Sequence, residues 1–392
     1  MKRVIALVDC NNFFVSCERL LKPELIGKPV CVLSNNDGCV VSRSNEAKRL
    51  GVEMGAPYFI AKNQFKKVVF LSGNLPFYCE ISKRVMDKLL DFTPDVEIYS
   101  IDEAFLDLTG LRKTFNCPYE EIVEKIVKDI KNEIGIDVSV GLSYSKTLAK
   151  LANDKAKNLQ KIKIDKKTYK IGFRKIEEEL KSTLISEVWG VGKNTTAFLK
   201  KYLIQSAWDF VSQQDFWIKK NLGKTGLELK QELLGEIVSP VDNKPNAPKS
   251  VSRSESFKEF QTDKNYIQKE LNHHIHRVCK KLRKEQLATS CIAIFLKTKD
   301  FFISDMKINL LKATNSEFEL INSAKNMLDK LFIPNTIYRS VGFCAMKLTN
   351  SNISQISLFD ENFEEKNNLS KTWDKLEDKF GKGILKLGLG EK

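Results

Sequence analysis

Residues 99–110 read YSIDEAFLDLTG and place two adjacent acids, Asp102 and Glu103, inside an apolar, strand-like run. A carboxylate buried without a partner is costly. Neighbouring residues of a regular strand point to opposite faces, so the two acids can act together only at a turn or bulge. The stretch therefore predicts a hairpin over residues 96–108 with the acidic pair at its bend.

A second predicted strand supplies a third acid. The short apolar run VIALV, residues 4–8, predicts a buried strand that ends at Asp9. Beside the hairpin, this strand would bring three carboxylates to one sheet edge, where they repel each other unless a cation lies among them. Hard oxygen ligands suit Mg²⁺, and two such ions serve phosphoryl or nucleotidyl transfer. The alternative is a solvated turn that carries two acids.

The N-terminal third alternates strand and helix patterns. Residues 11–21 have helical spacing, and a hairpin is predicted around Asn36-Asp37-Gly38, followed by a short helix that ends at Gly51. Isoleucines recur every four residues over 122–134, which predicts an amphipathic helix. Strict apolar alternation over 136–142 then predicts a half-buried strand.

The composition narrows the class of protein. The chain has 392 residues, which suggests two to four domains, and 42% of them are apolar. Its formal charge of +14 and pI near 9.2 suggest a polyanionic partner. No window approaches the roughly 18 apolar residues of a membrane span. Nine scattered cysteines without a CxxC pair favour reduced thiols, so we expect a cytoplasmic protein without a membrane partner.

Four stretches together carry a resemblance: DCNNFF from Asp9, residues 33–55, YSIDEAFLD from Tyr99, and residues 140–157. They closely resemble the Y-family of translesion DNA polymerases. Within that family SNNDGCVV, residues 34–41, is similar to the UmuC type, the catalytic subunit of DNA polymerase V. The resemblance covers essentially the whole chain. It implies a right-hand polymerase of mixed α/β and α+β architecture, with a palm, fingers, a helical thumb and a little finger.

The domain boundaries combine this resemblance with the local patterns. Three prolines and several polar residues in 236–250 predict a linker. After it, the patterns predict the order β-α-β-β-α-β. The expected domains are the palm (1–20 and 75–165), the fingers (21–74), the thumb with a helix-hairpin-helix-like segment (166–235), the linker (236–250), the little finger (251–350) and a C-terminal tail (351–392).

The resemblance assigns the catalytic centre. Asp9, Asp102 and Glu103 stand where the family holds its two metal ions, and the backbone carbonyl of Cys10 matches a further metal contact. The implied cofactors are two Mg²⁺ ions, and the substrates are deoxynucleoside triphosphates (dNTPs).

The resemblance also assigns the nucleotide-binding residues. Phe14 occupies the steric-gate position, where an aromatic ring leaves no room for a ribose 2′-hydroxyl. For the adjacent Phe13, in the same nucleotide-binding segment, we expect ordinary core packing. Lys48 and Lys157 match positions that meet the triphosphate, although either could instead lie on a solvated face. Other branches commonly carry arginine at Lys48 and tyrosine at Asn45, so a contact from Asn45 stays open.

Candidate DNA contacts lie in the second half of the chain. Gly190 and Gly192 precede a helix-like run that begins at Lys193, and such a turn can present backbone N–H groups to a phosphate. An ordinary helix cap needs the same glycine. Arg253, at the start of the little finger, is the remaining candidate.

The little finger is strongly basic. Residues 245–350 contain 18 Lys and Arg against 10 Asp and Glu, which suits sequence-independent contacts to DNA phosphates. The three histidines are expected on the surface, because no cysteine or acid lies near them at ligand spacing. Five basic residues of the first helix could grip DNA or could form a solvated face: Arg277, Lys280, Lys281, Arg283 and Lys284.

The tail carries a second resemblance. QISLFD, residues 355–360, is similar to the motif with which bacterial polymerases bind the sliding clamp, with Gln355, Leu358 and Phe359 as contacts. An apolar pair in a loop can also pack on its own domain. Residues 374–388 resemble the UmuC tail, which implies a UmuD′-like accessory subunit and the RecA filament as partners beside primed DNA template.

The resemblance to the Y-family implies an error-prone, template-directed DNA polymerase that bypasses damaged bases in the SOS response. Two other classes remain open. One is a catalytically silent, DNA-bound scaffold that recruits the clamp and repair partners, but the intact Asp9, Asp102 and Glu103 argue against it. The other is a two-metal nuclease, against which Phe14 and the triphosphate lysines indicate a nucleotide substrate.

Overall fold

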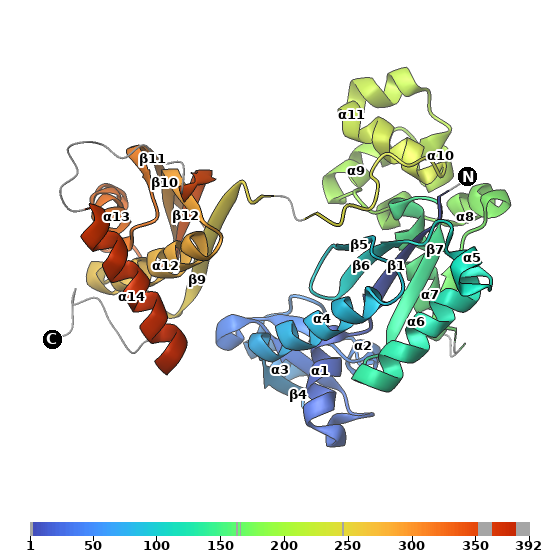
Figure 1. Cartoon of the computed structure of the whole chain (residues 1–392), viewed down its shortest axis with the longest axis horizontal. Coiled ribbons are helices and arrows are strands. Elements are labelled where there is room, and N and C mark those ends of the chain that lie inside the picture. Colours follow the sequence, from blue (N-terminus) through green and yellow to red (C-terminus); the bar gives the residue numbers. More distant parts are fainter. Residues whose placement is uncertain (1–2, 162–163, 165, 245–246, 352–362, 382–392) are drawn as a thin grey trace. The chain divides into compact units, whose positions relative to one another are not determined.

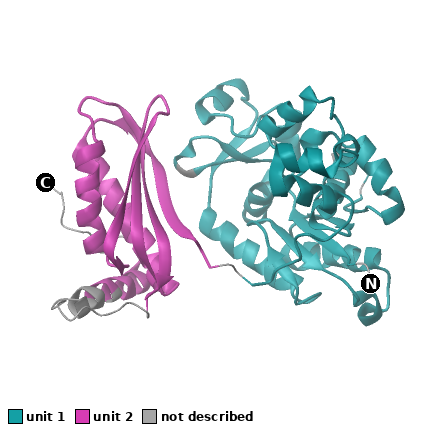
Figure 2. Ribbon diagram, turned by 90° about the horizontal axis from the view of Figure 1, so that it is seen from above, with its two compact units in different colours: residues 1–245 teal, residues 246–392 magenta. Residues whose placement is uncertain are grey.

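The computed structural model describes residues 3–161, 164, 166–244, 247–351 and 363–381. The chain divides into two compact units, residues 1–245 and 246–392, shown in Figures 1 and 2. The division falls inside the predicted linker. Across these described ranges, every helix is too short or too polar to span a membrane.

The core of unit 1 is a five-stranded sheet in the order β5-β6-β1-β7-β8. The central strand β1 (Ile5–Cys10) runs antiparallel to both β6 (Glu103–Asp107) and β7 (Val138–Ser143). Strand β5 (Val96–Ile98) pairs with β6 as the predicted hairpin, and the backbone N–H groups of Tyr99 and Ser100 donate to the carbonyl of Glu103 across its bend. The acidic pair therefore lies at the turn, as the sequence predicts.

Strand β7 is more deeply buried than its alternation predicts. All six of its residues are buried, because helix α7 (Lys146–Lys161) covers its second face. The small residues of that face permit the close approach. A Cβ atom on Gly141 would lie only 2.1 Å from the carbonyl oxygen of Ala149 in α7. The prediction of a half-buried strand was therefore wrong. The small residues at alternate positions of β7 face helix α7 and not solvent.

The rest of unit 1 surrounds this sheet (Figure 1). A smaller sheet, in the order β3-β2-β4, includes the predicted hairpin of β2 and β3, whose loop holds Asn36 and Asp37 at positive φ. A helical group follows β8. The remaining elements are α1 (Phe13–Leu21), β2 (Val30–Leu33), β3 (Val40–Arg43), α2 (Asn45–Arg49), α3 (Tyr58–Gln64), β4 (Val69–Ser72), α4 (Leu75–Leu89), α5 (Leu111–Phe115), α6 (Tyr119–Ile134), β8 (Thr168–Lys170), α8 (Ile176–Ser182), α9 (Lys193–Lys201), α10 (Ala207–Val211) and α11 (Asp215–Leu233).

Unit 2 is a four-stranded antiparallel sheet in the order β11-β10-β12-β9, packed against α12 and α13. Its chain order confirms the predicted β-α-β-β-α-β arrangement. An additional helix, which the sequence patterns do not predict, follows the last strand. The elements are β9 (Ser250–Gln261), α12 (Lys264–Lys284), β10 (Leu287–Thr298), β11 (Ile303–Thr314), α13 (Glu317–Leu331), β12 (Tyr338–Asn350) and α14 (Phe363–Phe380).

The surface position expected for the histidines is wrong for two of them. His273 is exposed, but His274 and His276 are buried in unit 2. Burial, reinforced by the charge of His273, lowers the pKa of His274 to about 4. His276 is buried because the unpredicted helix α14 packs over it, and its ring lies against Trp373 at 4.7 Å between centroids.

The close contact at Gly141 predicts a large effect of a single methyl group. Gly141→Ala should destabilise the chain by about 1–3 kcal/mol or more, because the new Cβ meets the backbone of α7, which cannot yield as a flexible side chain would. Gly172→Ala is the matched control, since nothing lies within 4 Å of its Cβ position. Urea unfolding measures both variants. Equal stability of the two would contradict the packing described for α7.

Candidate active site

The antiparallel pairing of β1 with β6 sets two carboxylates opposite each other. In this register Asp9 faces Glu103, the first residue of β6. Their side chains are only 7% and 15% exposed. The backbone N–H of Cys10 donates to the carbonyl of Asp102 at 2.9 Å, which ties the end of β1 to the hairpin bend. Two acids from distant parts of the sequence thus share one partly desolvated position.

Helix α7 supplies a lysine to each acid. Lys157 Nζ lies 2.5 Å from Asp9 Oδ2, and Lys150 Nζ lies 2.7 and 2.9 Å from the two carboxylate oxygens of Glu103. The lysines are seven residues apart, so they project from the same face of the helix. Lys150 also lies near the rings of Tyr99 and Trp189, 5.5 and 5.9 Å from their centroids.

The proximity of the two acids separates their pKa values. Burial raises the pKa of Asp9 to about 8, with a further contribution from its hydrogen bond to Glu103, and Lys157 only partly offsets both. Burial acts in the same direction on Glu103, but the hydrogen bond from Asp9 and the charge of Lys150 outweigh it and lower its pKa. The site therefore disfavours two negative charges side by side and favours additional positive charge.

The third acid is held differently. Asp102 Oδ1 accepts a hydrogen bond of 2.5 Å from Ser100 Oγ. Among the described residues, no group of three or more His, Cys, Asp or Glu side chains is arranged as a metal site. The chemistry of the donors nevertheless fits Mg²⁺. Asp9, Asp102, Glu103 and the Cys10 carbonyl offer only hard oxygen atoms, and the paired carboxylates of Asp9 and Glu103 favour a cation between them. Their role as metal ligands stays a prediction.

A pocket of about 400 Å³ contains both predicted triphosphate lysines. Lys48 Nζ lies 2.5 Å from Asn12 Oδ1, and Asn12 Nδ2 donates to Asn45 Oδ1 at 3.1 Å. Asn45 is therefore part of the pocket wall, although it is not shown to contact a nucleotide. The lining residues are Asn11, Asn12, Asn45, Lys48, Leu151, Asp154, Lys155, Lys157, Asn158, Gln160 and Glu187.

The two phenylalanines at the start of α1 have different surroundings. Phe13 is buried in the apolar core, as expected. Phe14 is half-buried and stacks on Tyr78, with 4.6 Å between ring centroids and 17° between ring planes. Tyr78 is fixed in turn, because its hydroxyl donates to Glu18 at 2.7 Å. Phe14 thus rests on a rigid support, as a steric wall requires.

The predicted DNA contacts of the glycine segment lie at the start of α9. Gly190 has a φ of 90°, which favours glycine, and exposed Gly192 is the N-cap residue before Lys193. Both the phosphate-contact and the helix-cap interpretations therefore remain compatible with this turn. Arg253 is half-buried on β9 between the exposed Ser252 and Ser254. Its contact with DNA stays a prediction.

The predicted clamp contacts Gln355, Leu358 and Phe359 lie outside the described residues. One residue of the candidate centre was missed altogether. Lys150 contacts both carboxylate oxygens of Glu103, at 2.7 and 2.9 Å, and its seven-residue spacing from Lys157 in the helix could have indicated it.

Comparison with known proteins identifies the class. Residues 8–154 match the impB/mucB/samB family, and residues 248–358 match the C-terminal domain of that family. The chain is 35% identical to protein UmuC of Salmonella typhimurium over 97% of its length and 92% of that protein. It is 30% identical to DNA polymerase IV of Clostridium kluyveri over 99% of its length and 98% of that protein.

Solved structures agree with these relatives. A Y-family DNA polymerase chimera of Dbh and Dpo4 matches with a TM-score of 0.75 and 25% identity, over 88% of this chain and 98% of the chimera. An insertion ternary complex of Dbh DNA polymerase matches with a TM-score of 0.60 and 25% identity, over the same shares of the two chains. The chain therefore belongs to the impB/mucB/samB family of Y-family DNA polymerases. This membership confirms the predicted fold and class of enzyme, a UmuC-like translesion polymerase of DNA repair.

The carboxylate pair predicts a stabilising effect of divalent metal. Mg²⁺ that binds only the folded chain should raise its stability by about 2.7 kcal/mol at a hundredfold excess over Kd. Asp9→Asn should abolish this effect, because the amide cannot supply the negative charge. Asp137→Asn is the control, since Asp137 also pairs with two lysines but directly precedes β7, which lies on the opposite side of β1 from β6 and Glu103. Thermal unfolding with and without Mg²⁺ measures the effect, and an equal shift in both variants would exclude the pair as the metal site.

Proposed function

We propose that the chain is an error-prone, template-directed DNA polymerase that adds dNTPs to a primer 3′-hydroxyl and bypasses damaged bases in the SOS response. The observation that carries the proposal is the pair of Asp9 and Glu103 beside a pocket with two lysines, in a chain of Y-family membership. The reaction needs cations at the carboxylates and ammonium groups at the triphosphate, and this arrangement supplies both kinds of position.

The proposed mechanism assigns each group one task. Asp9, Asp102, Glu103 and the Cys10 carbonyl would hold two Mg²⁺ ions, which when bound would supply the electrostatic stabilisation of phosphoryl transfer. Lys48 and Lys157 orient the triphosphate, as ammonium donors do for phosphate oxygens. For Lys157 this requires exchange of its contact with Asp9 for one with phosphate.

The remaining residues position the substrates. Phe14, supported by Tyr78, excludes a ribose 2′-hydroxyl, while the palm, fingers, thumb and little finger hold the primed template. Gly190, Gly192, Lys193 and Arg253 contact the DNA. Alignment of the reacting groups, rather than covalent chemistry by the protein, accounts for the acceleration.

The proposed partners follow from the relatives and the tail motifs. Primed DNA is the substrate, and the sliding clamp binds through residues 355–360. A UmuD′-like subunit and the RecA filament complete the assembly, which works in the cytoplasm. The similarity to protein UmuC supports these assignments.

Removal of two carboxylates should separate catalysis from DNA binding. Asp102→Ala/Glu103→Ala should lower primer extension by more than about a hundredfold, because the cations lose their ligands, while affinity for primed DNA is retained. Steady extension rates and fluorescence anisotropy measure the two properties. Retained synthesis would refute the metal assignment. A parent chain that binds DNA but never extends it would favour the scaffold.

Truncation of the proposed steric gate should relax sugar selection. Phe14→Ala should raise ribonucleotide incorporation by about tenfold or more relative to deoxynucleotide incorporation, because the 2′-hydroxyl no longer meets a ring. Single-nucleotide insertion with paired dNTP and rNTP substrates gives the ratio of kcat/KM. Phe77→Ala is a control aromatic truncation near Tyr78. An unchanged ratio in Phe14→Ala would remove the gate role.

A further inference from the structure

Lys150 lies against a cluster of three aromatic rings. Its Nζ is 5.5 Å from the ring centroid of Tyr99 and 5.9 Å from that of Trp189. The Trp189 ring packs edge to face on Tyr99, with 5.4 Å between centroids and 88° between ring planes, and lies 5.8 Å from Phe105. Tyr99 and Phe105 belong to the hairpin that carries Glu103, whereas Trp189 comes from the helical group after β8. Rings from two distant parts of unit 1 thus flank one ammonium group.

A tight turn presents Trp189 to this cluster. The backbone N–H of Val191 donates to the carbonyl of Val188 at 3.0 Å, which closes the turn around Trp189. Gly190 follows Trp189 with a φ of 90°, at the position where such a turn requires a residue that tolerates positive φ. Val188 and Val191 are buried in an apolar cluster of unit 1, so they anchor both ends of the turn. Trp189 is therefore held in place by the segment that also carries the proposed DNA contact Gly190.

The two lysines of the candidate site are held to different degrees. Lys150 Nζ contacts both carboxylate oxygens of Glu103, and its side chain is 19% exposed. Lys157 contacts one oxygen of Asp9, lines the pocket and is 31% exposed. Among the described residues, aromatic rings flank Lys150 but not Lys157. Lys157 can thus exchange its partner for a phosphate, whereas Lys150 is fixed on Glu103.

A fixed ammonium group can orient Glu103 without displacing a metal ion. A lysine has a flexible stem, so it holds a carboxylate in one orientation only where its own ammonium is immobilised, here by the rings. An ionised carboxylate has about four acceptor positions, which leaves room for a cation on the side that faces Asp9. The contact with Lys150 and a metal ion between the two acids are therefore compatible.

We propose that Lys150 is a positioning residue for Glu103, and that Trp189 holds Lys150 in that position. The orientation of a predicted metal ligand then depends on a turn of the helical group, beside the glycines proposed to contact DNA. The catalytic part of this role rests on the polymerase function proposed above. The contact of Trp189 with Lys150 does not depend on that function.

Kinetics of the full-length chain separate this role from nucleotide binding. Lys150→Gln should lower kcat for single-nucleotide insertion by about tenfold or more, because Glu103 loses its fixed orientation, while KM for the dNTP changes by less than about twofold. Lys150→Arg should restore most of kcat, since a guanidinium can also contact both carboxylate oxygens.

Lys146→Gln is the matched control. Lys146 lies on the same helix, pairs with Glu97 and is 5.5 Å from the ring centroid of Phe105, but it does not contact Glu103. Its kcat should stay within about twofold of the parent value. An equal loss of kcat in Lys150→Gln and Lys146→Gln, or a loss that appears in KM, would overturn the positioning role.

A double variant tests whether Trp189 acts through Lys150. Trp189→Leu should lower kcat by about threefold or more, whereas Trp189→Phe, which keeps an aromatic face, should stay within about twofold of the parent. Trp189→Leu/Lys150→Gln should be no slower than Lys150→Gln, because a residue that acts through Lys150 has no effect once Lys150 is gone. Independent losses that multiply in the double variant would overturn the role of Trp189.

The ammonium group of Lys150 gives a readout that does not depend on catalysis. Nuclear magnetic resonance of the chain labelled at lysine Nζ should show a slowly exchanging Lys150 ammonium signal, identified by its loss in Lys150→Arg. Trp189→Leu should raise its proton exchange rate by about threefold or more, and Trp189→Phe should not. An unchanged rate in Trp189→Leu would overturn the hold on Lys150. A parent chain without primer extension would overturn the polymerase function, while the exchange rates would still decide whether Trp189 fixes Lys150.

Discussion

The antiparallel register of β1 and β6 is the constraint on which the candidate site depends. It places Asp9 directly opposite Glu103 in a partly desolvated position, where two carboxylates cannot both be charged without nearby cations. Helix α7 supplies the compensating charges through Lys150 and Lys157. The helix can pack this closely on β7 because residue 141 is a glycine. Strand register, helix packing and charge compensation are thus parts of one arrangement.

The local patterns were sufficient for the elements that build this arrangement. The strand ending at Asp9, the hairpin at Asp102 and the order of elements in unit 2 all follow from short-range periodicity, because each element buries its own apolar face. The roles of Phe14 and Lys48 came instead from resemblance to a family, since a single phenylalanine or lysine carries no such information. Their presence in suitable surroundings supports those roles without testing them.

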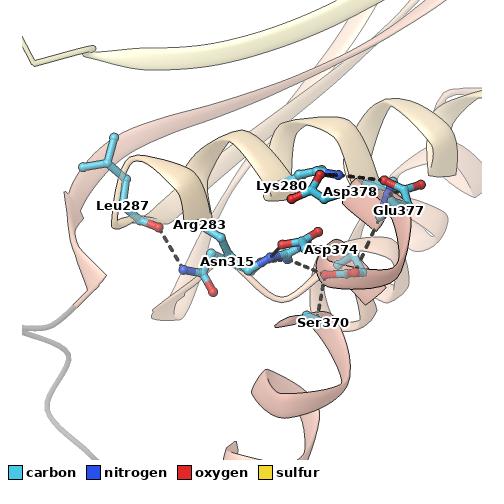
Figure 3. Close-up of polar contacts among 10 residues, drawn as sticks. Lys280, Arg283, Leu287, Asn315, Ser370, Asp374, Glu377 and Asp378 are labelled. Carbon is cyan, nitrogen blue, oxygen red and sulfur yellow. Dashed lines mark hydrogen bonds and ion pairs between the residues drawn. The ribbon is translucent and has the colours of Figure 1, made fainter. Parts of the chain in front are cut away.

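The errors share a physical cause: they concern contacts between elements that are far apart in sequence. The second face of β7 is buried by α7, which alternation within the strand cannot reveal. The role of Lys150 can be inferred only once Glu103 is known to lie beside it. The sequence of helix α14 gives no clear buried face by itself, and the residues that attach it are recognisable only from their contacts with His276, Lys280 and Arg283 of α12. Lys280 and Arg283, two of the five basic residues of α12 that were expected to grip DNA or to form a solvated face, instead pair with carboxylates of α14 (Figure 3).

The metal-binding role proposed for the lysine-compensated carboxylates of β1 and β6 is the assignment on which the proposed polymerase chemistry rests. The most direct measurement is anomalous X-ray diffraction from crystals of the chain grown with Mn²⁺, primed DNA and a non-hydrolysable dNTP. We expect anomalous peaks beside Asp9 and Glu103, with Lys157 moved from Asp9 to the triphosphate. Mn²⁺ located elsewhere, with both lysine–carboxylate contacts intact around a bound nucleotide, would contradict it.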